Sequence, residues 1–154
     1  MKKIVIILSV LLVVICAGCG TSVKNDLVEY VKFEQSADKE IQAVSSDFMK
    51  KISSVGNNKE EKVKLLNEVL KNLTDITEKQ RQYKPQTQDV QDIHNKGIKA
   101  LDTTRGAFDG LIQAVDSDTL TEEKIKEFNS KQQEINRLTT EYYNDIKALQ
   151  EKNK

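Results

Sequence analysis

Only one histidine, His94, is present in the 154-residue chain, and this limits the metal chemistry that the side chains could perform. A di-iron site of the ferritin type needs a Glu-x-x-His pair on each of two helices, whereas Gln91 stands three residues before His94. Haem could still be held by His94 together with Met49. A histidine on the apolar face of a helix is more often a buried residue with a hydrogen-bonded neighbour, and we expect that role for His94.

Two carboxylate pairs could bind a cation, but neither is surrounded by a ligand set. Asp89 and Asp92 stand where a helix is predicted to begin, and acidic side chains there favour the helix dipole. Asp116-x-Asp118 is like the start of a calcium loop, yet Leu120 takes the next liganding position and the sixth-position glycine is missing. We find no Ser-His-Asp or Cys-His set and no glycine-rich phosphate loop. The sequence therefore predicts a non-catalytic protein without metal or cofactor.

Two other features could serve binding rather than catalysis. Gly106 and Gly110 are four residues apart, so they share a helix face that lacks side chains. That face could be a groove for a ligand or partner, or a place where a neighbouring helix approaches closely, and we favour the close approach. Tyr142 fits an apolar stripe, so its neighbour Tyr143 is expected to point outward, where an exposed tyrosine could anchor an interface.

The first 19 residues have the organisation of an export signal. Lys2 and Lys3 form a positive start, and residues 4–15 are apolar apart from Ser9. A run of that length suits a signal peptide better than a membrane span, which needs about 20 residues. The run is followed by Cys16 and then by Ala17-Gly18-Cys19, where small residues precede the second cysteine.

In these residues the chain resembles bacterial lipoprotein precursors. The resemblance implies that Cys19 receives a diacylglyceryl group and that the chain is cut just before it, with Ala17 and Gly18 at the two preceding positions. Cys16 departs from the pattern, since that position usually holds an aliphatic residue. A diacyl anchor holds a protein stably on a membrane, so we expect the extracytoplasmic face of the cell membrane. An uncleaved N-terminal anchor and a cytosolic protein with a buried N-terminus are the alternatives.

The export signal and the helical pattern predict three parts of the chain. They are a signal peptide (1–18), a lipidated cysteine with its tether (19–25) and one helical domain (26–152). Removing 18 residues leaves 154 − 18 = 136, and removing Lys2 and Lys3 leaves 24 − 2 = 22 basic against 24 acidic side chains. A nucleic-acid binder would carry a net basic patch, so nucleic acid is not an expected partner. Tryptophan is absent, and only one proline and six glycines are present, which favours an all-α domain.

Four long helices are predicted, at about residues 26–55, 58–83, 87–115 and 122–151. Their boundaries are marked by a helix-ending glycine (Gly56), two N-caps (Asn58 and Thr121) and a helix-breaking proline (Pro85). Apolar residues recur three and four apart, and Glu34 interrupts the first stripe, which suggests a place near an end or rim. The expected inner residues of the first and last helices are Leu27, Tyr30, Ala37, Ile41, Val44, Phe48, Val55, Ile125, Phe128, Ile135, Leu138, Tyr142, Ile146 and Leu149.

Short loops make neighbouring helices antiparallel, so the pattern predicts an up-down-up-down four-helix bundle. A pair of extended helical hairpins that packs only on dimerisation is the alternative. The chain resembles, in general type, the small all-helical lipoproteins of Gram-positive bacteria. We expect a non-catalytic interaction module at the cell envelope, bound to another envelope protein or to a wall polymer. The other hypothesis is a small-ligand carrier with a cavity in the bundle core, near His94 and the glycine face.

Overall fold

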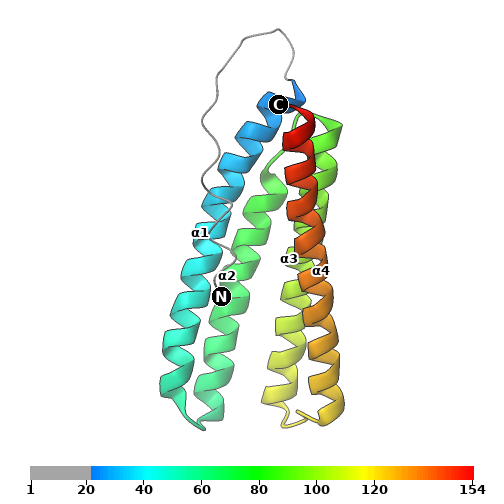
Figure 1. Ribbon diagram of the computed structural model, residues 1–154. Coiled ribbons are helices and arrows are strands. Elements are labelled where there is room, and N and C mark those ends of the chain that lie inside the picture. The colour runs from blue at the N-terminus through cyan, green and yellow to red at the C-terminus, as the bar shows by residue number, and fades with distance from the viewer. Residues whose placement is uncertain (1–21) are drawn as a thin grey trace.

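The computed structural model describes residues 22–154, and all of its regular structure is helical. Helix α1 spans Val23–Val55, α2 spans Lys59–Gln82, α3 spans Gln88–Asp116 and α4 spans Glu122–Lys152. The helices alternate in direction along one long axis (Figure 1). The predicted all-α four-helix bundle with up-down-up-down connections is confirmed.

Three of the helices begin at a side chain that caps their free amides. Asn25 N donates to Ser22 Oγ at 3.2 Å, Glu61 N to Asn58 Oδ1 at 3.2 Å, and Lys124 N to Thr121 Oγ1 at 3.3 Å. The caps at Asn58 and Thr121 agree with the sequence prediction. The first helix starts three residues before its predicted start, because Ser22 supplies a cap that the apolar pattern does not reveal.

A buried carboxylate replaces the missing side-chain cap of α3. The N-cap residue Thr87 makes no side-chain capping bond. Instead, Oδ2 of Asp26, in the first turn of α1, accepts from Gln86 N at 2.9 Å, from Thr87 N at 2.7 Å and from Thr87 Oγ1 at 2.7 Å. Asp26 is buried, so these bonds fix the α2–α3 connection against the start of α1.

We call the end where α1 and α3 begin and where α2 and α4 finish the closed end. All four helices meet there, and Figure 1 places the start of α1 and the C-terminus side by side. Its core joins residues from three helices: Leu27, Tyr30, Val90, Ile93, Tyr142 and Leu149. Further along the bundle, buried residues of α2 and α3 continue the core: Leu65, Leu66, Val69, Leu73, Ile76, Ala107, Ile112 and Ala114.

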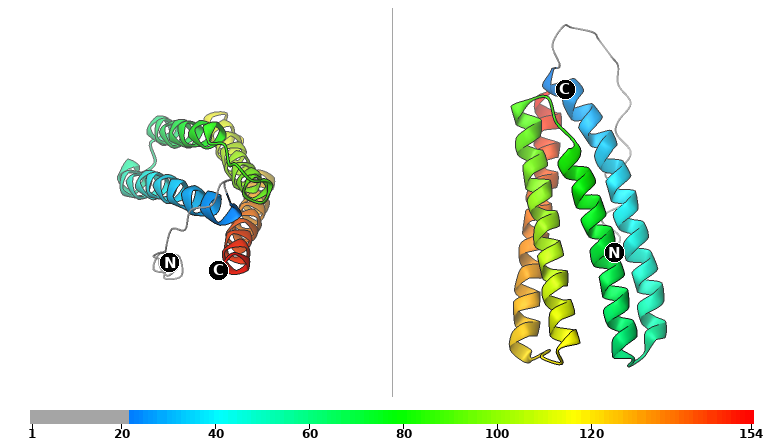
Figure 2. Two further views of the ribbon diagram at one scale, coloured as in Figure 1. Left: turned by 90° about the horizontal axis from the view of Figure 1, so that it is seen from above. Right: turned by 180° about the vertical axis from the view of Figure 1, so that it is seen from behind.

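Helices α1 and α4 diverge toward the other end, which we call the distal end. The distal ends of α1 and α4 lie on opposite sides of the bundle in both side views (Figures 1 and 2). No residue of 39–55 or of 120–137 is buried. The expected inner residues Ile41, Val44 and Phe48 are only half-buried, and Ile125 is 45% exposed. The apolar stripes continue there, but α1 and α4 do not cover one another.

Within residues 22–154, the helices are too polar or too short in their apolar stretches to span a membrane.

Candidate functional site

The closed end contains a buried polar cluster to which every helix contributes. We define this cluster as Tyr30 and Glu34 of α1, Gln80 of α2, His94 of α3 and Tyr142 of α4. Gln80, His94 and both tyrosines are buried, and Glu34 is half-buried. Polar side chains inside a small bundle need partners, so the contacts of this cluster determine what it can do.

The two tyrosines of the cluster connect α1 directly to α4. Tyr30 Oη and Tyr142 Oη are 3.0 Å apart and share a buried hydrogen bond. Burial raises the pKa of both phenols far above the ordinary value, and the nearby Glu34 carboxyl raises it further. Both hydroxyls therefore keep their protons near neutral pH, where they act as hydrogen-bond donors and acceptors.

Glu34 carries the most perturbed carboxyl of the cluster. Burial raises its pKa to about 7, Tyr142, Tyr30 and Gln80 oppose this by hydrogen bonding, and the charge of Asp38 adds to it. The sequence predicted a place near an end or rim, and Glu34 lies at the closed end, one turn after Tyr30 and beside Gln80 of α2 and Tyr142 of α4. The polar partners of its half-buried carboxyl were not predicted. A carboxyl with this pKa exchanges its proton near neutral pH.

A second contact between α1 and α4 lies one turn further along. Tyr143 Oη donates to Asp38 Oδ1 at 3.1 Å. Burial raises the pKa of Asp38, and the bond from Tyr143 opposes that effect. Tyr142 is buried and Tyr143 is 39% exposed, so the expected inward and outward orientations are confirmed. Tyr143 nevertheless holds an intramolecular contact.

His94 is only 1% exposed and lies against two tyrosine rings. The centroid of the His94 ring lies 5.6 Å from that of Tyr30, with the rings edge to face, and 5.9 Å from that of Tyr83. Burial lowers the pKa of His94, and the backbone of Gln80 raises it in part. The imidazole is therefore neutral near pH 7. The expected buried position is confirmed, while Nδ1 has no hydrogen-bond partner among the described residues.

The structure does not bring together the residues of the haem hypothesis. Met49 is 63% exposed and lies toward the distal end of α1, whereas His94 is buried at the closed end. Two of the candidate carboxylates have other partners: Asp92 accepts from Gln88, and Asp118 pairs with Lys59 at 2.6 Å. Residues 22–154 contain no group of three or more acidic, histidine or cysteine side chains arranged for a metal.

The glycine face on α3 does not have the expected role. A Cβ atom on Gly106 would meet nothing within 4 Å, and one on Gly110 would approach only Lys131 Nζ, at 3.9 Å. The expected close approach of a neighbouring helix is therefore wrong at these positions. The close approach is at Gly97, where a Cβ would lie 3.0 Å from Cε2 of Tyr142. Gly97 thus provides the space that lets Tyr142 reach the buried polar cluster.

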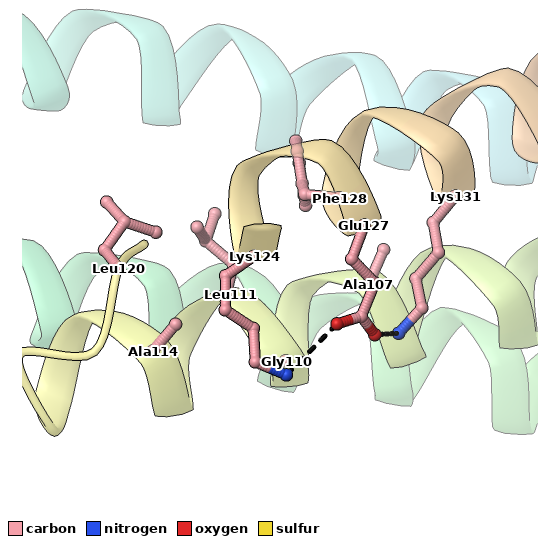
Figure 3. Close-up of a pocket in the computed structure, with 9 residues that line it drawn as sticks. All are labelled: Ala107, Gly110, Leu111, Ala114, Leu120, Lys124, Glu127, Phe128 and Lys131. Carbon is pink, nitrogen blue, oxygen red and sulfur yellow. Dashed lines mark hydrogen bonds and ion pairs between the residues drawn. The ribbon is translucent and has the colours of Figure 1, made fainter. Parts of the chain in front are cut away.

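A small hollow adjoins Gly110 between the distal parts of α3 and α4 (Figure 3). Its volume of about 30 Å³ is enough for roughly one water molecule. Figure 3 shows Glu127 paired with Lys124 and with Lys131, each at 3.1 Å, along one side of this hollow. Leu120 and Phe128 line the hollow as well. The hollow and His94 lie 16 residues apart along α3, or roughly 24 Å, so they form no common site.

A larger groove runs between α1 and α2, with a volume of about 420 Å³. Phe33 and Tyr83 stack in it with ring centroids 4.2 Å apart. Glu40 and Lys79 form an ion pair at 2.7 Å in the same groove, and Gln80 links its floor to the buried polar cluster. The volume lies in the range of small-ligand sites, and the sequence pattern had not indicated a groove at this position.

The residues of the lipidation signal, Cys16, Ala17, Gly18 and Cys19, lie outside the described part of the chain. No protein-family model matches this sequence, and comparison with curated proteins and with solved structures finds no significant match.

Proposed function

We propose that the chain is a membrane-anchored extracytoplasmic lipoprotein whose helical bundle is a non-catalytic interaction module at the cell envelope. The anchor part of the proposal rests on the first 19 residues: Lys2 and Lys3, an apolar run, and Ala17-Gly18 before Cys19. A diacylglyceryl group on Cys19 would hold the domain on the membrane.

The position of α1 fixes which end of the bundle lies near such an anchor. Helix α1 begins at Val23, at the closed end, so the three residues between Cys19 and Val23 leave at most about 13 Å of chain. The helix has 33 residues, or roughly 50 Å. The distal end would therefore face away from the membrane, where a partner could reach it.

The apolar character of that distal end is the observation that carries the interaction hypothesis. Met49, Leu120 and Ile125 are 63%, 47% and 45% exposed, and they belong to α1, to the α3–α4 connection and to α4, respectively. We call residues 39–55 and 120–137 the distal face. An apolar surface is a common feature of interaction sites, and this one lies opposite the predicted anchor.

The partner that fits best is an amphipathic helix of another envelope protein. In a closed bundle α1 and α4 would cover each other's apolar stripe, so a fifth helix seated between them would supply the missing contacts. The domain is near neutral, with 22 basic against 24 acidic residues after position 18. Apolar contact, rather than charge attraction, would therefore supply most of the affinity, and this favours a helix over a charged wall polymer.

The anchor is tested by replacing Cys19 with alanine in cells and separating membrane from soluble fractions. We expect the lipid-modified, processed form to disappear, with Cys16→Ala as the matched control that leaves processing intact. A Cys19→Ala protein that is still processed and lipid-modified would contradict the assignment.

The interaction face is tested by placing a charge on it. Met49→Asp and Ile125→Asp should each abolish recovery of the partner that crosslinks to the wild-type protein, while far-UV circular dichroism stays unchanged. Asn72→Asp, an exposed position of α2, is the control and should retain the partner. Equal recovery with all three variants would place the interaction elsewhere or disprove it.

The groove between α1 and α2 favours a second candidate function, a small-ligand carrier. The ligand would sit against Phe33 and Tyr83 at the surface, rather than in the bundle core near His94 and the glycine face. Organic extraction of the purified full chain followed by mass spectrometry would detect it. A compound recovered from the wild type but lost from Phe33→Ala would support a carrier, and its absence from both would argue against one.

A further inference from the structure

Direct hydrogen bonds between α1 and α4 are confined to the closed end. In the described chain, Tyr30 and Tyr142 share one such bond and Tyr143 donates another to Asp38. Glu34 lies between these two contacts, one turn after Tyr30 and one turn before Asp38, and Tyr142 also bonds to its carboxyl. Beyond this point the two helices diverge (Figure 2), and no residue of 39–55 or 120–137 is buried.

We infer that Glu34, Tyr30 and Tyr142 form a proton-controlled latch between α1 and α4, which is closed when Glu34 is protonated and loosened when Glu34 is ionised. The inference goes beyond the proposed interaction function and stands whether or not a partner binds the distal face.

The geometry explains why ionisation should loosen the contact. A protonated carboxyl can accept from the neighbouring hydroxyls and donate in return, so the buried groups remain satisfied without a net charge. An ionised carboxylate is stabilised by water more than by a buried site. It also stands one helical turn from Asp38, and like charges at that spacing repel one another. Moving α1 outward relieves both effects, because it lets water reach Glu34.

The groups that face Glu34 from each packed element supply donors rather than charge compensation. The donors are Tyr30 of α1, Gln80 of α2 and Tyr142 of α4, whereas Asp38 of α1 adds a like charge. The charge of Glu34 also raises the pKa of Tyr143 of α4 and that of Tyr83, which follows α2. Burial, the two tyrosines, Asp38 and Gln80 are the main influences on its pKa, which lies near 7, so the switch would operate close to neutral pH. His94 of α3 lies behind Tyr30, and burial keeps it neutral in this range.

The distance between the distal parts of α1 and α4 tests the latch directly. Nitroxide labels would be attached to a genetically encoded ketone amino acid at Lys50 and Lys126, two exposed positions, in the full chain in detergent micelles. Pulsed electron resonance would give the distance distribution at pH 5.5 and at pH 8. We expect a longer mean distance and a broader distribution at pH 8.

A label pair at Lys71 and Lys99, on α2 and α3, is the internal control and should give the same distances at both pH values. Glu34→Gln should keep the short distance at both pH values, because the amide cannot ionise. Tyr142→Phe should give the long distance at both, because it removes the hydroxyl that joins the helices. These opposite expectations keep the inference testable if one variant folds poorly.

Three results would overturn the inference. One is a wild-type distance between α1 and α4 that does not change with pH. Another is a change of the same size in Glu34→Gln. The third is an equal change in the control pair on α2 and α3, which would mean general loosening of the bundle. None of these results bears on whether a partner binds the distal face, so the proposed function is tested separately.

Discussion

Replacing Glu34 with glutamine should alter how the free energy of unfolding depends on pH. In the folded chain the pKa of Glu34 is about 7, against an ordinary value of 4.5, so the folded state binds this proton more tightly than the unfolded state. The resulting stabilisation is fully present below pH 4.5 and is lost as the pH rises through 7. Above that range the ionised, half-buried carboxylate makes no such contribution.

The size of the effect follows from the difference between the two pKa values. A tenfold change in proton affinity corresponds to about 1.36 kcal/mol, so a rise from 4.5 to about 7 corresponds to about 3 kcal/mol. Because Glu34 is only half-buried, solvent screening reduces this to about 2 kcal/mol. Glutamine cannot ionise, so the stability of Glu34→Gln relative to the wild type should rise by that amount between pH 4.5 and pH 8.

Urea unfolding of the full chain, followed by far-UV circular dichroism at several pH values, measures this difference. Burial lowers the pKa of His94, so its contribution is present above pH 6.5 and lost as the pH falls. Because His94 is the same in both proteins, its effect largely cancels in the comparison. Glu29→Gln, at an exposed glutamate of the same helix, is the control. Its difference from the wild type in the free energy of unfolding should not change with pH. A flat or falling difference for Glu34→Gln would refute the reasoning.

Two further substitutions, each with a control, test how the closed end is held together. Asp26→Ala should reduce the free energy of unfolding by about 2–4 kcal/mol, because it leaves the amides of Gln86 and Thr87 without their carboxylate partner. The exposed Asp89→Ala should lose less than about 1 kcal/mol in the same urea titration, and equal losses would contradict the role of Asp26. Gly97→Ala should lose about 1–3 kcal/mol because its Cβ would press on the buried Tyr142 ring. A methyl group at Gly106 meets open space, so Gly106→Ala should gain about 1 kcal/mol from helix propensity. Gly97→Ala should therefore lower the melting temperature in thermal unfolding, and Gly106→Ala should raise it.

Local sequence signals were enough to predict the helices and their connections. Asn58, Thr121 and Gly56 mark boundaries by their own chemistry, and the structure places all four helices within three residues of the predicted limits. The inward Tyr142 and the buried His94 also followed from periodicity. These features depend on contacts within a helix or on one helix face, and both leave a regular pattern in the sequence.

The features that the sequence did not reveal depend on where separate helices converge. Glu34 breaks an apolar stripe, and only the approach of Tyr142 from α4 and Gln80 from α2 makes it a half-buried carboxyl with a raised pKa. Likewise, Gly106, Gly110 and Gly97 look alike in sequence, and only Gly97 faces an aromatic ring. Apolar spacing cannot distinguish stripes that meet, as at Tyr30 and Tyr142, from stripes that diverge, as at Ile41 and Ile125.

Site-specific photocrosslinking in living cells tests the central claim, that the distal face binds an amphipathic helix of another envelope protein. A photoreactive amino acid would replace Met49 or Ile125 in one set of cells and exposed Asn72 of α2 in another, at native expression level. We expect one crosslinked protein from both distal positions and none from Asn72, with the crosslinks in that protein falling on the apolar side of one helix. Crosslinks that are absent, or that form equally from Asn72, would contradict the account.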